Sequence, residues 1–263
     1  MQIKIVGIVN VTRDSFSDGG LYLDARAAVQ RGLELAKEGA DVVELGAASS
    51  HPDSERVGVA EEIRRLEPVI GPLQEAGVEL SVDSYEPETQ RYALARGVSY
   101  LNDIQGFPNP DLYDDLARAA ARLVVMHSVQ LRGPATRAAT DPESILSRVD
   151  SFFERRVRAL QAAGVGRDRL VLDPGMGFFL GNDPAPSLLV LRNLRRLRER
   201  FGLPVLVSVS RKSFLGALTG RSTGELLSAS LAAELYAAGQ GIDYLRTHDV
   251  RSLRDGLRVL AAL

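Results

Sequence analysis

Short apolar runs rich in β-branched residues alternate along the chain with longer segments whose apolar residues recur at helical spacing. The short runs predict strands, at residues 3–9, 41–45, 79–82, 100–101, 123–126, 170–172, 205–209 and 243–245. The longer segments predict helices, at residues 21–37, 59–75, 86–96, 111–122, 142–163, 186–201, 223–239 and 252–263. Several helical patterns stop at a glycine just before the next strand, as helix C-caps do. These glycines are Gly39, Gly77, Gly97, Gly164 and Gly202.

The eight strand–helix units follow one another without a linker, a low-complexity segment or a shift in composition. Strands that alternate with helices predict a parallel sheet, and eight such units in about 250 residues match the size of a TIM barrel. We therefore expect one α/β domain, a TIM (β/α)8 barrel that spans residues 1–263. A doubly wound open sheet is the alternative, but its Gly-x-Gly-x-x-Gly turn after the first strand is absent.

Composition removes several classes of function. The net charge of -2 and the pI near 6.0 provide no broad basic field for nucleic acid or an anionic membrane. No apolar run approaches the roughly 18 residues of a membrane span, and the apolar N-terminus is too short for a signal peptide. The chain has no cysteine, which excludes disulfides, thiolate metal sites and a cysteine nucleophile. We expect a cytoplasmic protein that binds neither nucleic acid nor membrane.

Polar and charged residues follow every predicted strand. Because the carboxyl ends of barrel strands converge on one mouth, where active sites lie, eight polar ends together predict an enzyme. In chain order they are Asn10, Thr12, Asp14 and Ser15; Ser49, Ser50 and His51; Asp83; Asn102 and Asp103; His127; Asp173; Ser210, Arg211, Lys212 and Ser213; and Arg246, Thr247, His248 and Asp249.

Two kinds of ligand chemistry can be separated within this set. Asp83, Asn102 and Asp173 supply acceptors and one amide, which suits a flat heterocycle with adjacent N–H donors. The two aspartates have an alternative role, since either could cap the helix that follows it.

The second kind is anionic. Residues 210–213, with Arg246, His248 and Asn10, supply cations and donors for a phosphate or diphosphate, with Mg²⁺, which prefers oxygen ligands and substrate phosphates. Lys212 stands out because it is one of only three lysines in a chain that otherwise uses arginine. The alternatives are a solvated Arg211–Lys212 pair and structural histidines. The histidine spacing, with neither His-x-His nor His-x-x-x-His, argues against a zinc hydrolase.

The motifs in these positions resemble those of dihydropteroate synthases. Residues 7–20, Gly-Ile-Val-Asn-Val-Thr-Arg-Asp-Ser-Phe-Ser-Asp-Gly-Gly, resemble the first signature of that family. The later blocks follow in order, so that the resemblance spans essentially the whole chain. They are Ser-Val-Asp-Ser at 81–84, Leu-Asn-Asp-Ile at 101–104, Val-Met-His at 125–127, Leu-Asp-Pro-Gly-Met-Gly-Phe at 172–178, Ser-Arg-Lys-Ser-Phe-Leu-Gly at 210–216 and Arg-Thr-His at 246–248.

The resemblance implies an activity and a set of site residues. The family condenses 6-hydroxymethyl-7,8-dihydropterin diphosphate with 4-aminobenzoate, assisted by Mg²⁺, to form 7,8-dihydropteroate and diphosphate, and is usually homodimeric through its last helices. By position it implies a pterin pocket of Asp83, Asn102, Asp173 and Lys212, a diphosphate and Mg²⁺ site of Asn10, Arg246 and His248 with Asn10 on the metal, and Ser213 beside the aminobenzoate. The catalytic residues it implies are Asp83, Asp173, Lys212, Arg246 and His248.

The chain departs from the common family pattern in three loops. Arg13 replaces a proline, and Ser50 and His51 replace a threonine and an arginine. The sixth loop carries an apparent insertion around Phe178, Phe179 and Leu180. These departures occur together in the Sul-type branch of the family, which confers sulfonamide resistance.

The three apolar residues of the sixth loop either pack in the core or shape the pocket. Our hypothesis is that Phe178, Phe179 and Leu180 exclude the bulkier sulfonamide and admit the flat aminobenzoate, which predicts low sulfonamide sensitivity. Two other functions stay open from the sequence. One is a pterin-binding methyltransferase-like barrel, which has no need of the 210–213 and Arg246–His248 diphosphate set. The other is a non-catalytic pterin-binding barrel, which the Ser50–His51 replacement keeps open.

Overall fold

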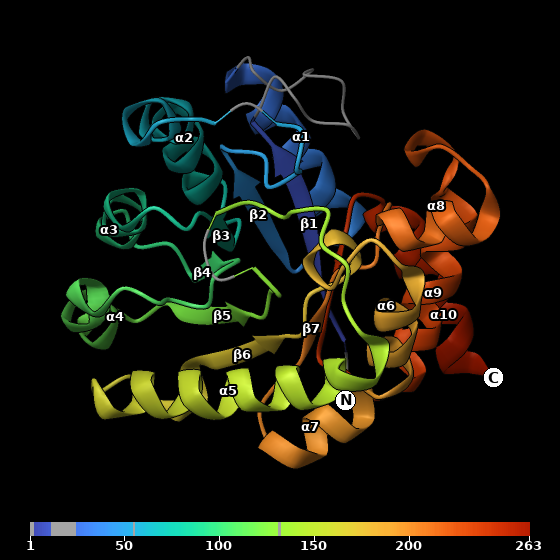
Figure 1. Cartoon of the computed structure of the whole chain (residues 1–263). Coiled ribbons are helices and arrows are strands. Elements are labelled where there is room, and N and C mark those ends of the chain that lie inside the picture. The colour runs from blue at the N-terminus through green and yellow to red at the C-terminus, as the bar shows by residue number, and fades with distance from the viewer. Residues whose placement is uncertain (1–2, 12–24, 55, 131–132) are drawn as a thin grey trace.

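The computed structural model describes residues 3–11, 25–54, 56–130 and 133–263. Within them, eight parallel strands form one sheet in the order β6-β5-β4-β3-β2-β1-β8-β7. A parallel bridge between Leu172 of β6 and Val205, just before β7, joins the two ends of this order. The sheet therefore closes into a barrel, and the helices surround it (Figure 1). The predicted TIM barrel is confirmed. Three residues of the predicted mouth, Thr12, Asp14 and Ser15, lie outside the described residues, as do Arg13 and the predicted helix start at 21.

Each predicted apolar run overlaps one strand. The strands are β1 (Lys4–Asn10), β2 (Val42–Gly46), β3 (Leu80–Asp83), β4 (Tyr100–Asp103), β5 (Arg122–Met126), β6 (Leu170–Asp173), β7 (Leu206–Val207) and β8 (Tyr244–Thr247). The five glycines predicted to end helices all have positive φ, between 56° and 107°. Only glycine takes this conformation without a steric cost, which is why the helices stop there.

The helices follow the predicted segments with three differences. They are α1 (Ala25–Glu38), α2 (Val59–Glu75), α3 (Pro87–Ala95), α4 (Tyr113–Arg118), α5 (Ile145–Ala162), α6 (Pro184–Arg192), α7 (Leu194–Phe201), α8 (Ser213–Thr219), α9 (Leu227–Gly239) and α10 (Val250–Ala262). The predicted helix 186–201 is two helices, because Asn193 leaves helical geometry (φ -114°, ψ 17°) and its side chain donates to the Leu189 carbonyl at 2.8 Å. The predicted helix 111–122 ends at Arg118, because Ala119 is extended. The sequence pattern did not predict α8.

Two hydrophobic layers result from the alternation of side chains along each strand. Outward-facing residues pack against the helices in one large cluster. Inward-facing residues fill the amino-terminal part of the barrel, namely Val6, Val42, Tyr100, Val124, Val171, Leu206 and Tyr244. Two residues further along their strands, the inward positions become polar, at Glu44, Asn102, Asp173, Ser208 and Arg246. The polar layer therefore lies directly on an apolar floor. In the part of the chain described here, no helix has both the length and the apolar character of a membrane span.

Candidate active site

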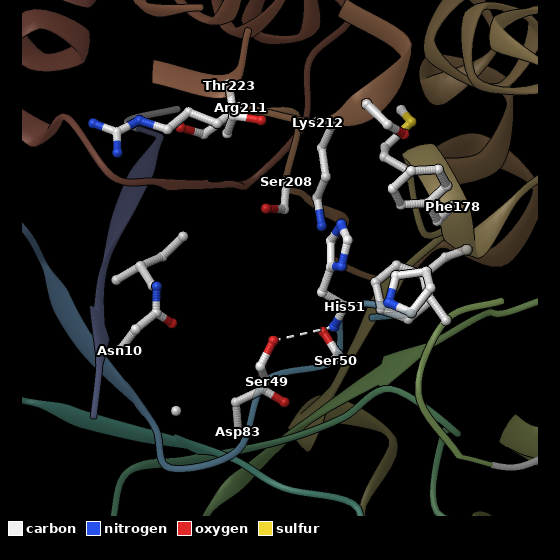
Figure 2. A pocket seen from close by; sticks show the side chains of 18 of the residues that line it. Asn10, Ser49, Ser50, His51, Asp83, Phe178, Ser208, Arg211, Lys212 and Thr223 are labelled. Carbon is white, nitrogen blue, oxygen red and sulfur yellow. Dashed lines mark hydrogen bonds between the residues drawn. The ribbon is translucent and has the colours of Figure 1, made fainter. Parts of the chain in front are cut away.

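A cavity of about 430 Å³ lies at the carboxyl ends of the strands, above this polar layer (Figure 2). A narrower recess adjoins it and shares part of its lining. Between them they bring together all the predicted site residues. The cavity is lined by Asn10, Ser50, His51, Asp83, Phe178, Phe179, Lys212, Ser213, Arg246 and His248, and the recess adds Asn102 and Asp173.

The centre of the polar layer is Glu44 of β2, a fully buried carboxylate that the sequence reasoning missed. Arg246 of β8 donates to it through Nε and to the Asp83 carboxylate through Nη2, the latter at 3.1 Å. Ser81 Oγ and Asn102 Nδ2 also donate to Glu44, at 2.9 and 3.2 Å. A buried charge needs such partners, because moving an ion out of water costs on the order of several kcal/mol. The sequence signal that could have identified Glu44 was its position as a glutamate inside the apolar run 41–45.

Two polar atoms beside this network are buried without a hydrogen-bond partner among the described residues. Because the Asn102 amide nitrogen is committed to Glu44, its Oδ1 is left as an acceptor, and it has no partner. Ser208 Oγ is the second. Both residues line the recess. An unpaired buried polar group costs about 1–3 kcal/mol, so the recess is built for a ligand that supplies the missing partners.

Burial shifts the titration of the groups around the recess. It raises the pKa of Asp173 to about 6, although the Gly175 N–H donates to its carboxylate at 2.8 Å. Burial likewise raises the pKa of Asp83, and the neighbouring Glu44 adds to the effect. Burial lowers the pKa of Lys212 to about 8, with Arg246 acting in the same direction. Near pH 7, Asp173 is therefore mostly ionised and Lys212 mostly protonated.

The structure decides between the alternatives left by the sequence. Neither Asp83 nor Asp173 caps a helix, because α3 begins after Glu86 and Asp173 accepts from a residue of its own loop. His127 has the structural role, since its buried ring has Nδ1 3.1 Å from the Pro174 carbonyl and meets Phe152 edge to face. The other two histidines line the cavity.

The loop after β6 approaches its neighbour so closely that Gly175 accepts no side chain. Its φ is +73°, and an added Cβ would lie 2.3 Å from the His127 carbonyl oxygen. We predict that Gly175→Ala lowers the free energy of unfolding by about 3 kcal/mol, measured by urea denaturation. Gly97→Ala is the matched control, because φ is +69° there but nothing lies within 4 Å of the added Cβ. It should cost only about 1–2 kcal/mol, and equal losses at both sites would contradict the steric explanation.

The two phenylalanines after Gly177 point to different environments. Phe178 lines the cavity, where the His51 ring meets it edge to face at 5.4 Å and the Arg137 guanidinium lies 5.9 Å from its centroid. Figure 2 shows Phe178 and His51 close together at one side of the cavity. An ion pair between Arg137 and Asp53, with one bond of 2.7 Å, joins the loops that carry these contacts.

Phe179 is 5% exposed and packs with Ile104, Met126 and Ala135, and the Lys212 ammonium lies 5.1 Å from its ring centroid. Leu180, by contrast, is fully buried in the outer core and lines neither the cavity nor the recess. Of the three apolar residues of this loop, only the phenylalanines are therefore placed to contact a ligand.

Comparisons with known proteins agree with this geometry. The family model described as "Pterin binding enzyme" matches residues 6–248. The type-2 dihydropteroate synthase of Escherichia coli is 57% identical over 98% of this chain and 95% of its own length, and the type-3 enzyme of that species is 54% identical over 99% of both. The chain belongs to the dihydropteroate synthase family. A solved structure of the Xanthomonas albilineans dihydropteroate synthase with 4-aminobenzoic acid superimposes with a TM-score of 0.89, at 39% identity over 99% of this chain and 93% of that one.

Residues at the carboxyl ends of β1, β7 and β8 form another part of the cavity lining. In Figure 2, Asn10 lies across the cavity from Lys212 and His51. His248 Nδ1 forms a hydrogen bond with Ser210 Oγ at 3.0 Å. Burial lowers the pKa of His248 well below its usual value. Its ring is therefore neutral at pH 7. Among the described residues, no group of three histidine, aspartate or glutamate side chains is arranged to hold a metal ion.

Proposed function

We propose that this synthase joins 6-hydroxymethyl-7,8-dihydropterin diphosphate to 4-aminobenzoate, releasing diphosphate. The observation that carries the proposal is the polar layer on which the cavity stands. There a buried Glu44–Arg246–Asp83 network leaves Asn102 Oδ1 and Ser208 Oγ unpaired beside a cation-lined opening. This arrangement binds a heterocycle rich in N–H groups below and an anion above. The two alternative functions are not favoured, because the full-length relatives are synthases.

The pterin is proposed to lie in the recess with its guanidine-like edge against Asp173 and Asn102. Both acceptors are buried, and Asn102 Oδ1 accepts no hydrogen bond from the described residues. Loss of diphosphate leaves a methylene cation delocalised into the ring. An ionised Asp173 stabilises that charge where it develops.

The diphosphate is proposed to meet Arg246, His248 and Asn10. An aryl amine is neutral at pH 7 and needs no strong base, so that departure of the charged leaving group is the difficult step. Arg246 is held by Glu44 and Asp83 and needs no reorganisation to stabilise the charge that appears on the diphosphate oxygens. Lys212, at the start of α8, contributes a second positive charge.

We also propose that Mg²⁺ binds with the diphosphate at Asn10. The donor set fits this ion, because Mg²⁺ is held by one or two protein oxygens plus substrate phosphates, and the half-buried Asn10 lines the cavity. When bound, the ion would neutralise charge on the leaving group.

The aminobenzoate is proposed to lie near Ser213 and the two phenylalanines, all of which line the cavity. Its carboxylate is flat, whereas a sulfonamide is tetrahedral and bulkier at the same position. A rigid aromatic wall therefore rejects the drug by size. We propose low sulfonamide sensitivity on this basis, with Phe178 and Phe179 as the excluding residues.

We also propose that the protein is a homodimer in the cytoplasm. Within the described residues, the large hydrophobic side chains that are exposed lie on α8, α9 and α10 and at the C-terminus, on one side of the barrel (Figure 1). They are Leu218, Leu227, Tyr236, Val259, Leu260 and Leu263. Exposed apolar side chains on helices that contact one another, as α9 contacts α8 and α10, are typical of an interface.

The deciding experiment is diphosphate release by the purified chain with the dihydropterin diphosphate, Mg²⁺ and 4-aminobenzoate. Steady release that depends on both substrates supports the synthase. Binding of the pterin diphosphate by calorimetry, without release when aminobenzoate is added, would support a non-catalytic barrel instead and direct attention to His51.

The pH dependence of kcat/KM for the pterin substrate provides a further prediction. Asp173 must be ionised and its pKa is raised to about 6, so kcat/KM should rise with pH through that value. Lys212 must be protonated and its pKa is lowered to about 8, so kcat/KM should fall above it. The acid limb is corrected for the substrate's own titration, followed by ³¹P NMR. Lys212→Arg should lose the alkaline limb, since arginine stays charged. A flat profile in the wild type would contradict the assigned roles.

A further inference from the structure

A buried amide on the outer side of the barrel joins the ends of β3 and β4. Gln90 of α3 is 1% exposed. Its Nε2 donates to the Ser84 carbonyl at 2.7 Å and to Asp103 Oδ2 at 3.0 Å. Ser84 follows Asp83, the last residue of β3, and Asp103 follows Asn102 in β4. One side chain is therefore bonded beside both of the acceptors that these two strands present to the recess.

The direction of both bonds is set by their partners. A backbone carbonyl can only accept, so the amide nitrogen of Gln90, and not its oxygen, must face Ser84. The Asp103 carboxylate also serves as an acceptor, because the backbone N–H groups of Gln105 and Phe107 donate to it at 2.7 and 3.0 Å. Both hydrogens of the Gln90 amide are therefore used. We call the two bonds, from Gln90 to Ser84 and to Asp103, the Gln90 bridge.

The Gln90 bridge lies on the opposite face of the strands from the recess. Side chains alternate between the two faces of a strand, so Asn102 points inward to Glu44 whereas Asp103 points outward to α3. Gln90 lines neither the cavity nor the recess and is not placed to touch a ligand there. Any effect of Gln90 on the recess must therefore pass through the backbone of the strand ends.

The backbone bonds between β3 and β4 stop at this point. Among the described residues, the last of them runs from the Ser84 N–H to the Asn102 carbonyl, at 3.1 Å. The chain then turns through Phe107, whose φ of 59° is uncommon for a residue with a side chain and whose N–H is held by Asp103. The bridge therefore holds the two strand ends together just beyond the last backbone bond between them.

We infer that Gln90 is a positioning residue that fixes the end of β4 against β3 and thereby places Asn102 Oδ1 for the pterin. The bridge itself is observed, and its use in pterin binding rests on the proposed function. Asn102 Nδ2 is held by Glu44 at 3.2 Å, while Oδ1 accepts no bond from the described residues. The backbone at Asn102 therefore decides where this oxygen lies. A displaced strand end would lengthen the bond that Oδ1 offers to a pterin N–H, and such bonds weaken beyond about 3.2 Å.

Calorimetric binding of 6-hydroxymethylpterin and of inorganic diphosphate tests the inference without turnover. Gln90→Met keeps the length of the side chain and removes both donors. It should raise Kd for the pterin about 10-fold, on the order of one weakened hydrogen bond. Kd for diphosphate should change less than about twofold, a difference of only about 0.4 kcal/mol, because β2 and β1 separate β3 from β8 and β7 in the sheet. Gln90→Asn is one methylene shorter and can reach only one acceptor, so its Kd for the pterin should lie between those of wild type and Gln90→Met.

Asn193→Leu is the matched control for the loss of a structural amide. Its Nδ2 also donates to a backbone carbonyl, that of Leu189 at 2.8 Å, and Asn193 lines neither the cavity nor the recess. Urea denaturation should show lower stability for both Gln90→Met and Asn193→Leu, while only Gln90→Met loses affinity for the pterin. Equal losses of pterin affinity in the two variants, or an unchanged Kd in folded Gln90→Met, would overturn the inference.

Steady-state kinetics separates placement of the pterin from an effect on the reaction. Gln90→Met should raise KM for the pterin diphosphate by a factor similar to the change in Kd. KM for aminobenzoate should stay unchanged and kcat should stay within a few fold. A fall in kcat with an unchanged KM for the pterin diphosphate would contradict the positioning role.

The outcomes also distinguish this inference from the proposed function. A wild-type chain that binds the pterin without turnover would overturn the proposed reaction, and the Kd values of the Gln90 variants would still decide the role of Gln90. A wild-type chain that binds no pterin would overturn both.

Discussion

Arg246→Leu is expected to lower kcat/KM on the order of 10³-fold, the loss seen when one preorganised donor to a developing oxyanion is removed. Arg246 is the cation placed closest to the centre of the polar layer, and its two bonds to Glu44 and Asp83 hold it in position before substrate arrives. The measurement is diphosphate release at varied pterin substrate. Arg246→Lys should recover only part of the activity, because an ammonium cannot bridge both carboxylates in the same way.

Arg246→Leu also affects stability, and this effect must be separated from the loss of catalysis. Without Arg246, Glu44 is a fully buried carboxylate that has lost its charged partner, and breaking such a pair costs about 3–5 kcal/mol. Adding Glu44→Gln removes the unpaired charge. The double variant should therefore regain most of the free energy of unfolding in urea while activity stays low.

Arg198→Leu controls for the loss of a paired arginine elsewhere. Arg198 of α7 bonds Asp243 at 3.0 and 3.1 Å, and neither residue lines the cavity. This variant should lose stability and retain kcat. If Arg246→Leu retained kcat within a few fold, or if Arg198→Leu lost as much, the assigned role of Arg246 would be wrong.

Deletion of Phe179 is expected to increase sensitivity to sulfonamides about 100-fold, which corresponds to about 2.7 kcal/mol. The ring packs between Lys212 and the Ile104–Met126–Ala135 cluster, so that its removal loosens the loop that also carries Phe178. The inhibition constant of a sulfonamide and KM for aminobenzoate are measured on the same preparation. The inhibition constant of the sulfonamide should fall by a much larger factor than the change in KM for aminobenzoate, because the flat substrate does not need the space that opens.

Two single substitutions locate the effect. Phe178→Ala removes the ring that lines the cavity and should also increase drug sensitivity. Leu180→Ala should lower stability by about 2–5 kcal/mol, as for other buried leucines, and leave the ratio of drug inhibition to KM unchanged, because Leu180 lies in the outer core. Unchanged inhibition in the Phe179 deletion, in a variant that still folds and turns over, would rule out discrimination by size.

The sequence by itself determined the barrel and the location of the site. Each strand is an apolar run, each of five helices ends at a glycine with positive φ, and polar residues follow the strands. These are local properties, set by side-chain hydrophobicity and backbone sterics over a few residues. In a barrel of parallel strands, all the carboxyl ends lie at the same mouth. Ten of the predicted site residues line the cavity for this reason, and Asn102 and Asp173 line the recess.

Only the tertiary structure decided which polar residues meet. Glu44 belongs to an apolar run in the sequence, and its role follows from partners on β3, β4 and β8 that are 37 to 202 residues away. The separation of Phe178 from Leu180 likewise depends on packing between distant segments. Hydrogen bonds and burial act over a few ångströms in space, whatever the distance along the chain, and a linear pattern contains no record of those neighbours.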